Sequence, residues 1–217
     1  MFGLSPLEVV AALFGAVSVY LSARQHLASW PTAIVNVVLS AVVYYGARLY
    51  SDAGLQGVYL VLSVYGWYEW KFGGAGRTEL PVTRTPRAHA AVLAALTVAA
   101  ALAIGTLTTR YTDILQHNRV WVPWTDATLT AASLAAQWMM TRKLLENWLV
   151  WIAVDVVYVP LLAYKGLYAF AVLYAVFLAL AVKGYVEWRR DVANGVGRTG
   201  AYERGGAGGG GAVLRAE

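Results

Sequence analysis

The chain has 217 residues, of which 59% are hydrophobic and 13% charged, with a formal net charge of +5 at pH 7. Its mean hydropathy is +0.54, and a soluble domain is roughly a quarter charged, so the composition excludes a water-soluble fold. The sequence has no cysteine, which excludes disulfides, a thiolate nucleophile and cysteine-based metal sites.

Seven stretches are long and apolar enough to cross the hydrocarbon core as helices, which takes about 20 residues each. In chain order they are residues 5–21, 32–50, 55–72, 89–107, 125–141, 148–164 and 167–188. The first has no basic residue before it and contains Glu8, so we expect a spanning helix rather than a cleaved signal peptide. The sequence thus predicts an all-α integral membrane protein with seven transmembrane helices.

The distribution of lysine and arginine between alternate loops predicts how the chain sits in the cell membrane. One side holds twelve of these residues and the other holds four. The richer side carries Arg24, Lys71, Arg77, Arg84, Arg87, Arg142, Lys143, Arg189, Arg190, Arg198, Arg204 and Arg215. Because cytoplasmic loops carry the excess, we expect the N-terminus outside and the C-terminus in the cytoplasm. Basic residues placed this way do not indicate a nucleic-acid partner.

The chain divides into a transmembrane domain, residues 1–190, and a C-terminal tail, residues 191–217. Residues 205–211 are all glycine except Ala207. A segment so poor in apolar side chains cannot bury enough surface to fold. The sequence therefore predicts a disordered cytoplasmic tail.

An internal repeat becomes visible when the chain is aligned with itself at a shift of 118 residues. Trp30 falls on Trp148, and residues 66–71 (GWYEWK) fall on residues 184–189 (GYVEWR). Apolar bias alone does not produce this uncommon block, so we interpret it as a duplication. The repeats then cover about 5–72 and 125–188.

The alanine-rich helix at residues 89–107 lies between the repeats and has no counterpart in either. Three helices would leave the second repeat inverted, and one more crossing restores its orientation. The predicted plan is therefore two parallel three-helix repeats joined by a linker helix. Parallel repeats around a cavity at the membrane midplane are typical of transporters. We assign the linker helix no contact with the solute.

Polar side chains inside spans are costly and therefore indicate function. The candidates for substrate binding are Asn36, Gln56, Tyr59, Ser63, Trp148, Trp151 and Asp155. Their spacings of three, four and seven place those of each helix on one face. Tryptophan rings, amides and a carboxylate suit a flat aromatic solute with hydroxyl groups. A cationic ring would also gain from the tryptophan faces and from the charge of Asp155.

Each candidate also has a purely structural interpretation. Trp148, at the start of its segment, fits an aromatic belt at the membrane interface. Asn36 and Gln56 fit hydrogen bonding between helices. Asp155 fits an ion pair with Lys165 or Lys183, although Lys165, ten residues further along the chain, is within reach only if other helices bring it in. These alternatives stay open at the level of sequence.

Motifs that would carry catalysis are missing. His26, His89 and His117 are scattered, and there is no H-E-x-x-H, P-loop or G-x-S-x-G pattern. We therefore expect no enzyme activity, no metal site and no cofactor. A membrane enzyme would need a nucleophile, an acid–base pair or a metal, and a receptor would need a folded signalling domain.

Several ordered motifs carry a resemblance to a known family. They are WPTAIVN at 30–36, RLYSDAGLQ at 48–56, YGWYEW at 65–70, ENWLVW at 146–151 and KGLY at 165–168. Over residues 5–190 the chain resembles the PnuC family of vitamin transporters, whose best-known members take up nicotinamide riboside. The resemblance implies a 3+1+3 bundle similar in plan to the SWEET transporters, often a homotrimer.

The resemblance also implies a mechanism and part of a site. Members work by facilitated diffusion, and a separate cytoplasmic kinase phosphorylates the riboside and so traps it. The family's W-x-x-W matches Trp148 and Trp151, and a family glutamine matches Gln56. Relatives carry thiamine or riboflavin on a similar scaffold, so thiamine and then riboflavin are the alternative substrates. Asp155 favours nicotinamide riboside and thiamine, because both are cations.

Overall fold

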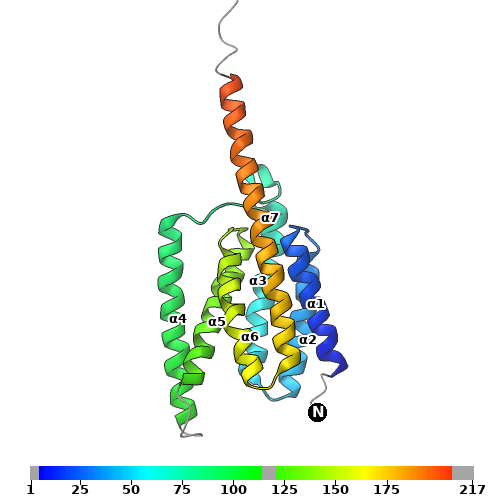
Figure 1. The fold of residues 1–217 in the computed structure, drawn as a ribbon, viewed down its shortest axis with the longest axis vertical. Coiled ribbons are helices and arrows are strands. Elements are labelled where there is room, and N and C mark those ends of the chain that lie inside the picture. The colour runs from blue at the N-terminus through cyan, green and yellow to red at the C-terminus, as the bar shows by residue number, and fades with distance from the viewer. Residues whose placement is uncertain (1–4, 114–120, 207–217) are drawn as a thin grey trace, which may run out of the picture.

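The structure, a computed structural model, describes residues 5–113 and 121–206. Seven α-helices and one three-residue 3-10 helix make up its regular elements. They are α1 (Pro6–Ala23), α2 (Ser29–Gly46), α3 (Tyr50–Phe72), η1 (Ala75–Arg77), α4 (Arg87–Asp113), α5 (Trp121–Thr141), α6 (Asn147–Tyr164) and α7 (Tyr168–Gly206). Six of the helices form a bundle, and α4 stands at its edge beside α5 (Figure 1).

The ends of the helices follow local sequence signals. α1 begins with a capping box, in which the Ser5 side chain accepts from the Glu8 backbone and the Glu8 side chain accepts from the Ser5 backbone. The boundary between α2 and α3 differs from the prediction, because the turn lies within the second predicted segment. Arg48 occupies that turn with a φ of 61°, and hydropathy alone counts the neighbouring Leu49 and Tyr50 as part of a span.

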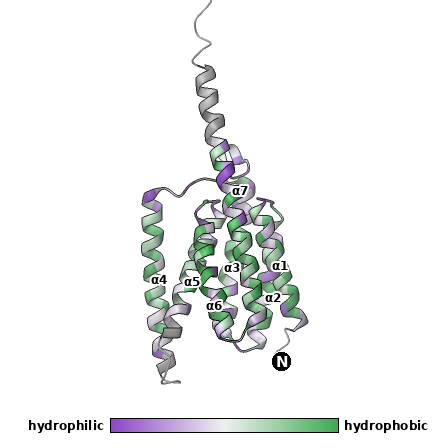
Figure 2. Ribbon diagram, viewed as in Figure 1, coloured by the Kyte–Doolittle hydropathy of each residue, from purple (hydrophilic) through white to green (hydrophobic). Residues whose placement is uncertain are grey.

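Five helices of the described chain, α1, α2, α4, α6 and α7, are both long and apolar enough to cross a membrane. α3 and α5 have the necessary length, at 23 and 21 residues, but they are more polar. Figure 2 shows the green, hydrophobic character of α4 and of the lower part of α7. The two more polar helices stand among apolar neighbours, so their polar side chains need not face lipid.

A cluster of four tryptophans closes one end of the bundle. Trp30 and Trp70 meet edge to face at 5.2 Å, and Trp148 and Trp188 do so at 5.4 Å. The Trp70 and Trp188 rings lie 5.8 Å apart and join the two pairs. All four rings are buried, and we call them the tryptophan cluster.

Hydrogen bonds and glycines around this cluster recur at a spacing of 118 residues. Trp70 Nε1 donates to the Met140 carbonyl at 2.9 Å, and Trp188 Nε1 donates to the Ser22 carbonyl at 3.2 Å. Gly66 lies against the Trp30 ring, as Gly184 lies against that of Trp148. Positive φ angles recur at residues 25 and 143 and at residues 48 and 166.

The segment between α3 and α4 crosses the same end of the bundle. The Thr83 backbone donates to the Lys143 carbonyl at 3.1 Å and accepts from the Leu145 amide at 2.8 Å. The backbone amide and the hydroxyl of Thr85 each donate to Glu146 Oε2 at 2.7 Å. Leu80 packs against the tryptophan cluster. This segment therefore adds a second layer to the closed end.

Lys143 lies beneath that layer, with its Nζ 4.6 Å from the centroid of the Trp70 ring. Burial lowers the pKa of Lys143, while the charge of Glu79 acts in the opposite direction. A buried ammonium over an indole face gains cation–π attraction, which offsets part of its lost hydration.

α7 continues as one helix to Gly206, so the prediction of disorder from residue 191 differs from the structure up to that point. Extending a helix that already exists adds a hydrogen bond for each residue and avoids the cost of nucleation. The rest of the predicted tail, residues 207–217, lies outside the described residues.

Candidate functional site

The bundle encloses a cavity of about 450 Å³. Side chains of α1, α2, α3, α5, α6 and α7 line it, and no described residue of α4 does. At one end its lining residues are buried, namely Trp30, Trp148 and Ala181. At the other end it reaches the exposed carboxylates of Asp52 and Asp126. The cavity therefore opens at the end of the bundle where α1, α3 and α5 begin. The tryptophan cluster closes the opposite end.

The residues singled out from the sequence come together here. Asn36, Gln56, Tyr59, Ser63, Trp148, Trp151 and Asp155 all line the cavity. They reach it from α2, α3 and α6, whose polar faces point toward a common space. The spacing in the sequence placed the candidates of each helix on one face, and in the structure these faces all point into the cavity.

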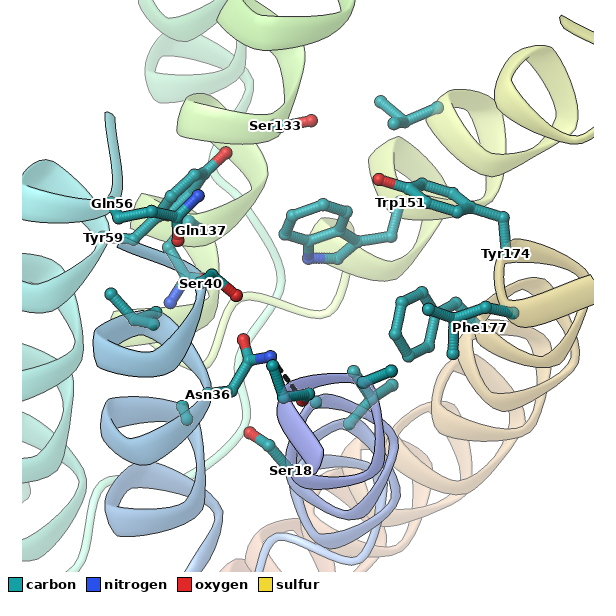
Figure 3. A pocket seen from close by; sticks show the side chains of 18 of the residues that line it. Ser18, Asn36, Ser40, Gln56, Tyr59, Ser133, Gln137, Trp151, Tyr174 and Phe177 are labelled. Atoms are coloured by element: carbon teal, nitrogen blue, oxygen red, sulfur yellow. Dashed lines mark hydrogen bonds between the residues drawn. The ribbon is translucent and has the colours of Figure 1, made fainter. Parts of the chain in front are cut away.

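The cavity has two unlike walls (Figure 3). Gln56 and Tyr59 of α3, with Asn36 and Ser40 of α2, form a hydrogen-bonding wall, which continues into α5. Trp151 of α6 faces them, beside rings from α7. We call these the polar wall and the aromatic wall. Such an arrangement can bind an aromatic ring on one side and hydroxyl or amide groups on the other.

The rings of the aromatic wall contact one another. Tyr158 and Tyr174 have their centroids 4.8 Å apart, and Tyr174 and Phe177 have theirs 5.7 Å apart. Contacts of this kind fix the ring planes and leave less freedom to be lost when a solute binds.

Asn36 bonds to a neighbouring helix and also lines the cavity. Its Nδ2 donates to the Ala11 carbonyl of α1 at 2.7 Å, which is the interhelical bond considered from the sequence. The side chain still lines the cavity. Gly15 permits this approach, because a Cβ there would lie 3.1 Å from Asn36 Nδ2.

The two tryptophans of α6 occupy different places. Trp148 is only 1% exposed, so it does not lie in a lipid-facing belt, and its ring forms part of the cavity floor. Trp151 is half-buried, and its ring extends from α6 into the cavity (Figure 3).

The cavity floor carries polar atoms without partners. The indole nitrogens of Trp30 and Trp148 and the hydroxyl of Ser63 are buried, and none has a hydrogen-bond partner among the described residues. All three residues line the cavity. Buried polar atoms are normally satisfied. These three groups therefore keep an unused hydrogen-bonding capacity beside the cavity, and because neighbouring atoms cover them, a solute reaches them only after a local rearrangement.

Asp155 is 3% exposed, and it has no hydrogen bond or ion pair within residues 5–113 and 121–206. Two lysines were considered as its structural partner, and both interact with other groups: Lys165 interacts with Asp126. Lys183 pairs with Glu187 at 3.9 Å and lies 4.8 Å from the Tyr20 ring centroid. Among the described residues, the structure therefore contains neither an Asp155–Lys165 nor an Asp155–Lys183 ion pair.

Several cavity residues were not found from the sequence. Ser133 and Gln137 of α5 line the cavity, as do Tyr174 and Phe177 of α7. The sequence did contain a signal, because the two α5 residues are four apart and the two α7 residues three apart, which places each pair on one helix face. However, aromatic rings in an apolar span equally indicate packing or lipid contact. Among the described residues, no three His, Asp or Glu side chains are grouped as metal ligands.

These features define a multi-pass α-helical membrane protein with a solute-sized cavity in its bundle. The chain belongs to the family described as nicotinamide mononucleotide transporter, whose match covers residues 5–190. The family assignment made from the sequence motifs is thereby confirmed.

Curated relatives include transporters of different vitamins. The chain is 29% identical over 191 residues to the riboflavin/roseoflavin transporter RibM of Streptomyces davaonensis, covering 85% of this chain and 86% of RibM. It is 25% identical over 209 residues to the nicotinamide riboside transporter PnuC of Escherichia coli, covering 86% of each chain. The fold is similar to the crystal structure of the vitamin B3 transporter PnuC, with a TM-score of 0.64, 22% identity and coverage of 87% and 82%.

Proposed function

We propose that this protein takes up nicotinamide riboside across the cell membrane by facilitated diffusion. A cavity with a polar wall facing an aromatic wall carries the proposal, because the riboside joins a flat ring to a sugar with hydroxyl groups. Membership of the transporter family supports the reaction class. Phosphorylation by a cytoplasmic kinase then traps the solute and makes uptake net inward, as the family resemblance implies.

In this proposal the solute lies across the cavity. The nicotinamide ring stacks on Trp151, and the sugar hydroxyls bond to Asn36, Gln56 and Tyr59 of the polar wall. Ser63 and the indole of Trp148 offer hydrogen-bonding atoms at the floor, which supports their inclusion in the site.

Thiamine is the first alternative substrate and riboflavin the second. All three vitamins combine flat rings with polar attachments, so stacking does not separate them. The 29% identity to RibM is a specific reason to keep riboflavin. Binding of each vitamin to the purified protein, measured by calorimetry, tests the substrate directly. Binding of the riboside alone is expected, and no binding of any vitamin would contradict the proposed function.

We further propose the 3+1+3 arrangement, with alternating access through movement of the two repeats. The recurrence of hydrogen bonds, close glycines and turns at a spacing of 118 residues supports it. Parallel repeats of this kind rock around a fixed site in other transporters. The family resemblance adds a homotrimer as the proposed assembly.

A variant at the aromatic wall tests the site. Trp151→Ala should weaken riboside binding about tenfold or more, equivalent to about 1.4 kcal/mol, because the solute loses its stacking surface. Gln56→Ala should also weaken binding, by removing an amide partner. Titration calorimetry on purified protein measures both effects.

Trp67→Ala is the matched control, because this tryptophan is 40% exposed and does not line the main cavity. It should bind the riboside as the unmodified protein does. Undiminished binding by both Trp151→Ala and Gln56→Ala would move the site elsewhere.

The proposed orientation of the chain in the membrane, with the N-terminus outside, can be tested separately. The chain has no cysteine, so single introduced cysteines label without background. Lys165→Cys, in the exposed α6–α7 turn, should react with an impermeant maleimide in intact cells. Arg84→Cys, in the exposed α3–α4 segment, should react only after the membrane is permeabilised. The reverse pattern would place the N-terminus in the cytoplasm.

A further inference from the structure

Three carboxylates surround the open end of the cavity. Glu8 comes from the start of α1, Asp52 from the start of α3 and Asp126 from the first part of α5, and all three line the cavity. Asp52 and Asp126 are exposed. Asp126 interacts electrostatically with Asp52, and Tyr44 interacts with both Asp52 and Glu8. The three charges therefore act on a common space, which we call the acidic mouth.

No described lysine, arginine or histidine lines the cavity, whereas four carboxylates do, counting Asp155. Lys165 interacts with Asp126 from outside the lining and neutralises part of the charge at the rim. The remaining excess is negative. A low-dielectric cleft with charge of one sign focuses its field and concentrates solutes of the opposite charge.

Asp155 extends this pattern into the depth of the cavity. Its side chain is 3% exposed and lines the cavity, and within the described residues it has no ion-pair or hydrogen-bond partner. A buried carboxylate without a partner is strongly unfavourable. A cationic solute would supply the missing charge, so this second observation points to a ligand independently of the mouth.

We infer that the acidic mouth and Asp155 form a charge filter that selects a cationic solute over a neutral solute of the same shape. The mouth raises the rate at which a cation arrives, and Asp155 stabilises it once bound. The inference rests on the proposed function, because it takes the cavity as the path of the solute. It favours the riboside and thiamine, which are cations, over neutral riboflavin.

The sharpest probe pair is nicotinamide riboside and its reduced dihydro form, because the two differ in ring charge and hardly in shape. The purified protein should bind the cation at least tenfold more tightly than the neutral form. Asp155→Asn should remove most of this preference while keeping a side chain of the same size. Equal affinity of the unmodified protein for both forms would overturn the inference and leave the transport proposal standing.

The mouth is tested by association rates. A triple variant, Glu8→Gln with Asp52→Asn and Asp126→Asn, should slow association of the cation about tenfold at low salt. Glutamine at position 8 preserves the capping box at the start of α1. The neutral form should associate at an unchanged rate. Glu79→Gln, at the opposite end of the bundle, removes one charge where the triple variant removes three, and it is the control for losing a carboxylate away from the mouth.

Salt dependence of the unmodified protein provides a test that needs no variant. Raising ionic strength should slow association of the cation and leave the neutral form unaffected. An association rate for the cation that does not respond to salt would overturn the role of the mouth. Failure of both forms and of every vitamin to bind would instead reject the proposed function, and the charge filter with it.

Discussion

Replacing Gly66 with alanine is expected to lower the melting temperature of the purified protein by about 2–12 °C. A Cβ at this position would lie 2.2 Å from the Trp30 ring, far inside van der Waals contact. Overpacking of a buried site costs about 1–3 kcal/mol. In a chain of this size each kcal/mol moves the melting temperature by about 2–4 °C.

The size of the effect depends on whether Trp30 can move away. Its ring is 2% exposed and meets Trp70 edge to face at 5.2 Å. Trp70 is in turn held by the Met140 carbonyl and by the Trp188 ring. A shift of one ring therefore disturbs the whole tryptophan cluster. Gly184→Ala should have a similar effect, since its Cβ would lie 2.6 Å from Trp148.

Gly57→Ala is the matched control, because it lies on the same helix and its Cβ would meet nothing within 4 Å. Alanine favours helix over glycine by up to about 1 kcal/mol, so this variant should be as stable as the unmodified protein or more so. Thermal unfolding in detergent, followed by intrinsic fluorescence, compares the three proteins. Equal melting temperatures for Gly66→Ala and Gly57→Ala would contradict the close helix contact.

The sequence could predict the helices and the residues that share a helix face, because hydropathy and helical spacing are local properties. Asn36, Gln56 and Trp151 could be singled out as candidates for that reason, and all three line the cavity. The repeat block also drew attention to residues 66–71, but not to the contact between Gly66 and Trp30. That contact depends on how closely two helices approach, which no local pattern specifies.

Residues that the sequence reading missed share a physical cause. Phe177 is an aromatic ring in an apolar span, and such a ring also suits lipid or core packing. Asp52 and Asp126 lie near the ends of spans, where a carboxylate is inexpensive and draws no attention. Only the packing of α3 against α5 brings these two carboxylates to one opening.

The closed end of the bundle must open if a bound solute is to leave on that side. Indole hydrogen bonds cross it from Trp70 to the Met140 carbonyl and from Trp188 to the carbonyls of Ser22 and Ala23. Each joins a residue before α4 to one after it, so each resists separation of the two halves of the chain. The bonds therefore favour the form with the cavity open at the acidic mouth.

The double variant Trp70→Phe with Trp188→Phe is expected to shift the population toward the form open at the tryptophan cluster. Phenylalanine keeps a ring but removes the N–H donor, and each carbonyl left without its partner costs about 1–3 kcal/mol. A total shift of about 3 kcal/mol would change the ratio of the two forms about 150-fold. Accessibility of Ser63, which is buried at the cavity floor and has no hydrogen-bond partner, reports this change.

In a background carrying Ser63→Cys, an impermeant maleimide applied from the side of the tryptophan cluster should label the double variant much faster than its parent. Trp67→Phe is the control, because it removes an indole from an exposed position and should not change the labelling rate. An unchanged rate in the double variant would mean that the indole bonds do not hold this end closed. The segment between α3 and α4 would then be the stronger barrier, since Thr83 and Thr85 attach it to residues 143–146 by hydrogen bonds that do not involve the indole nitrogens.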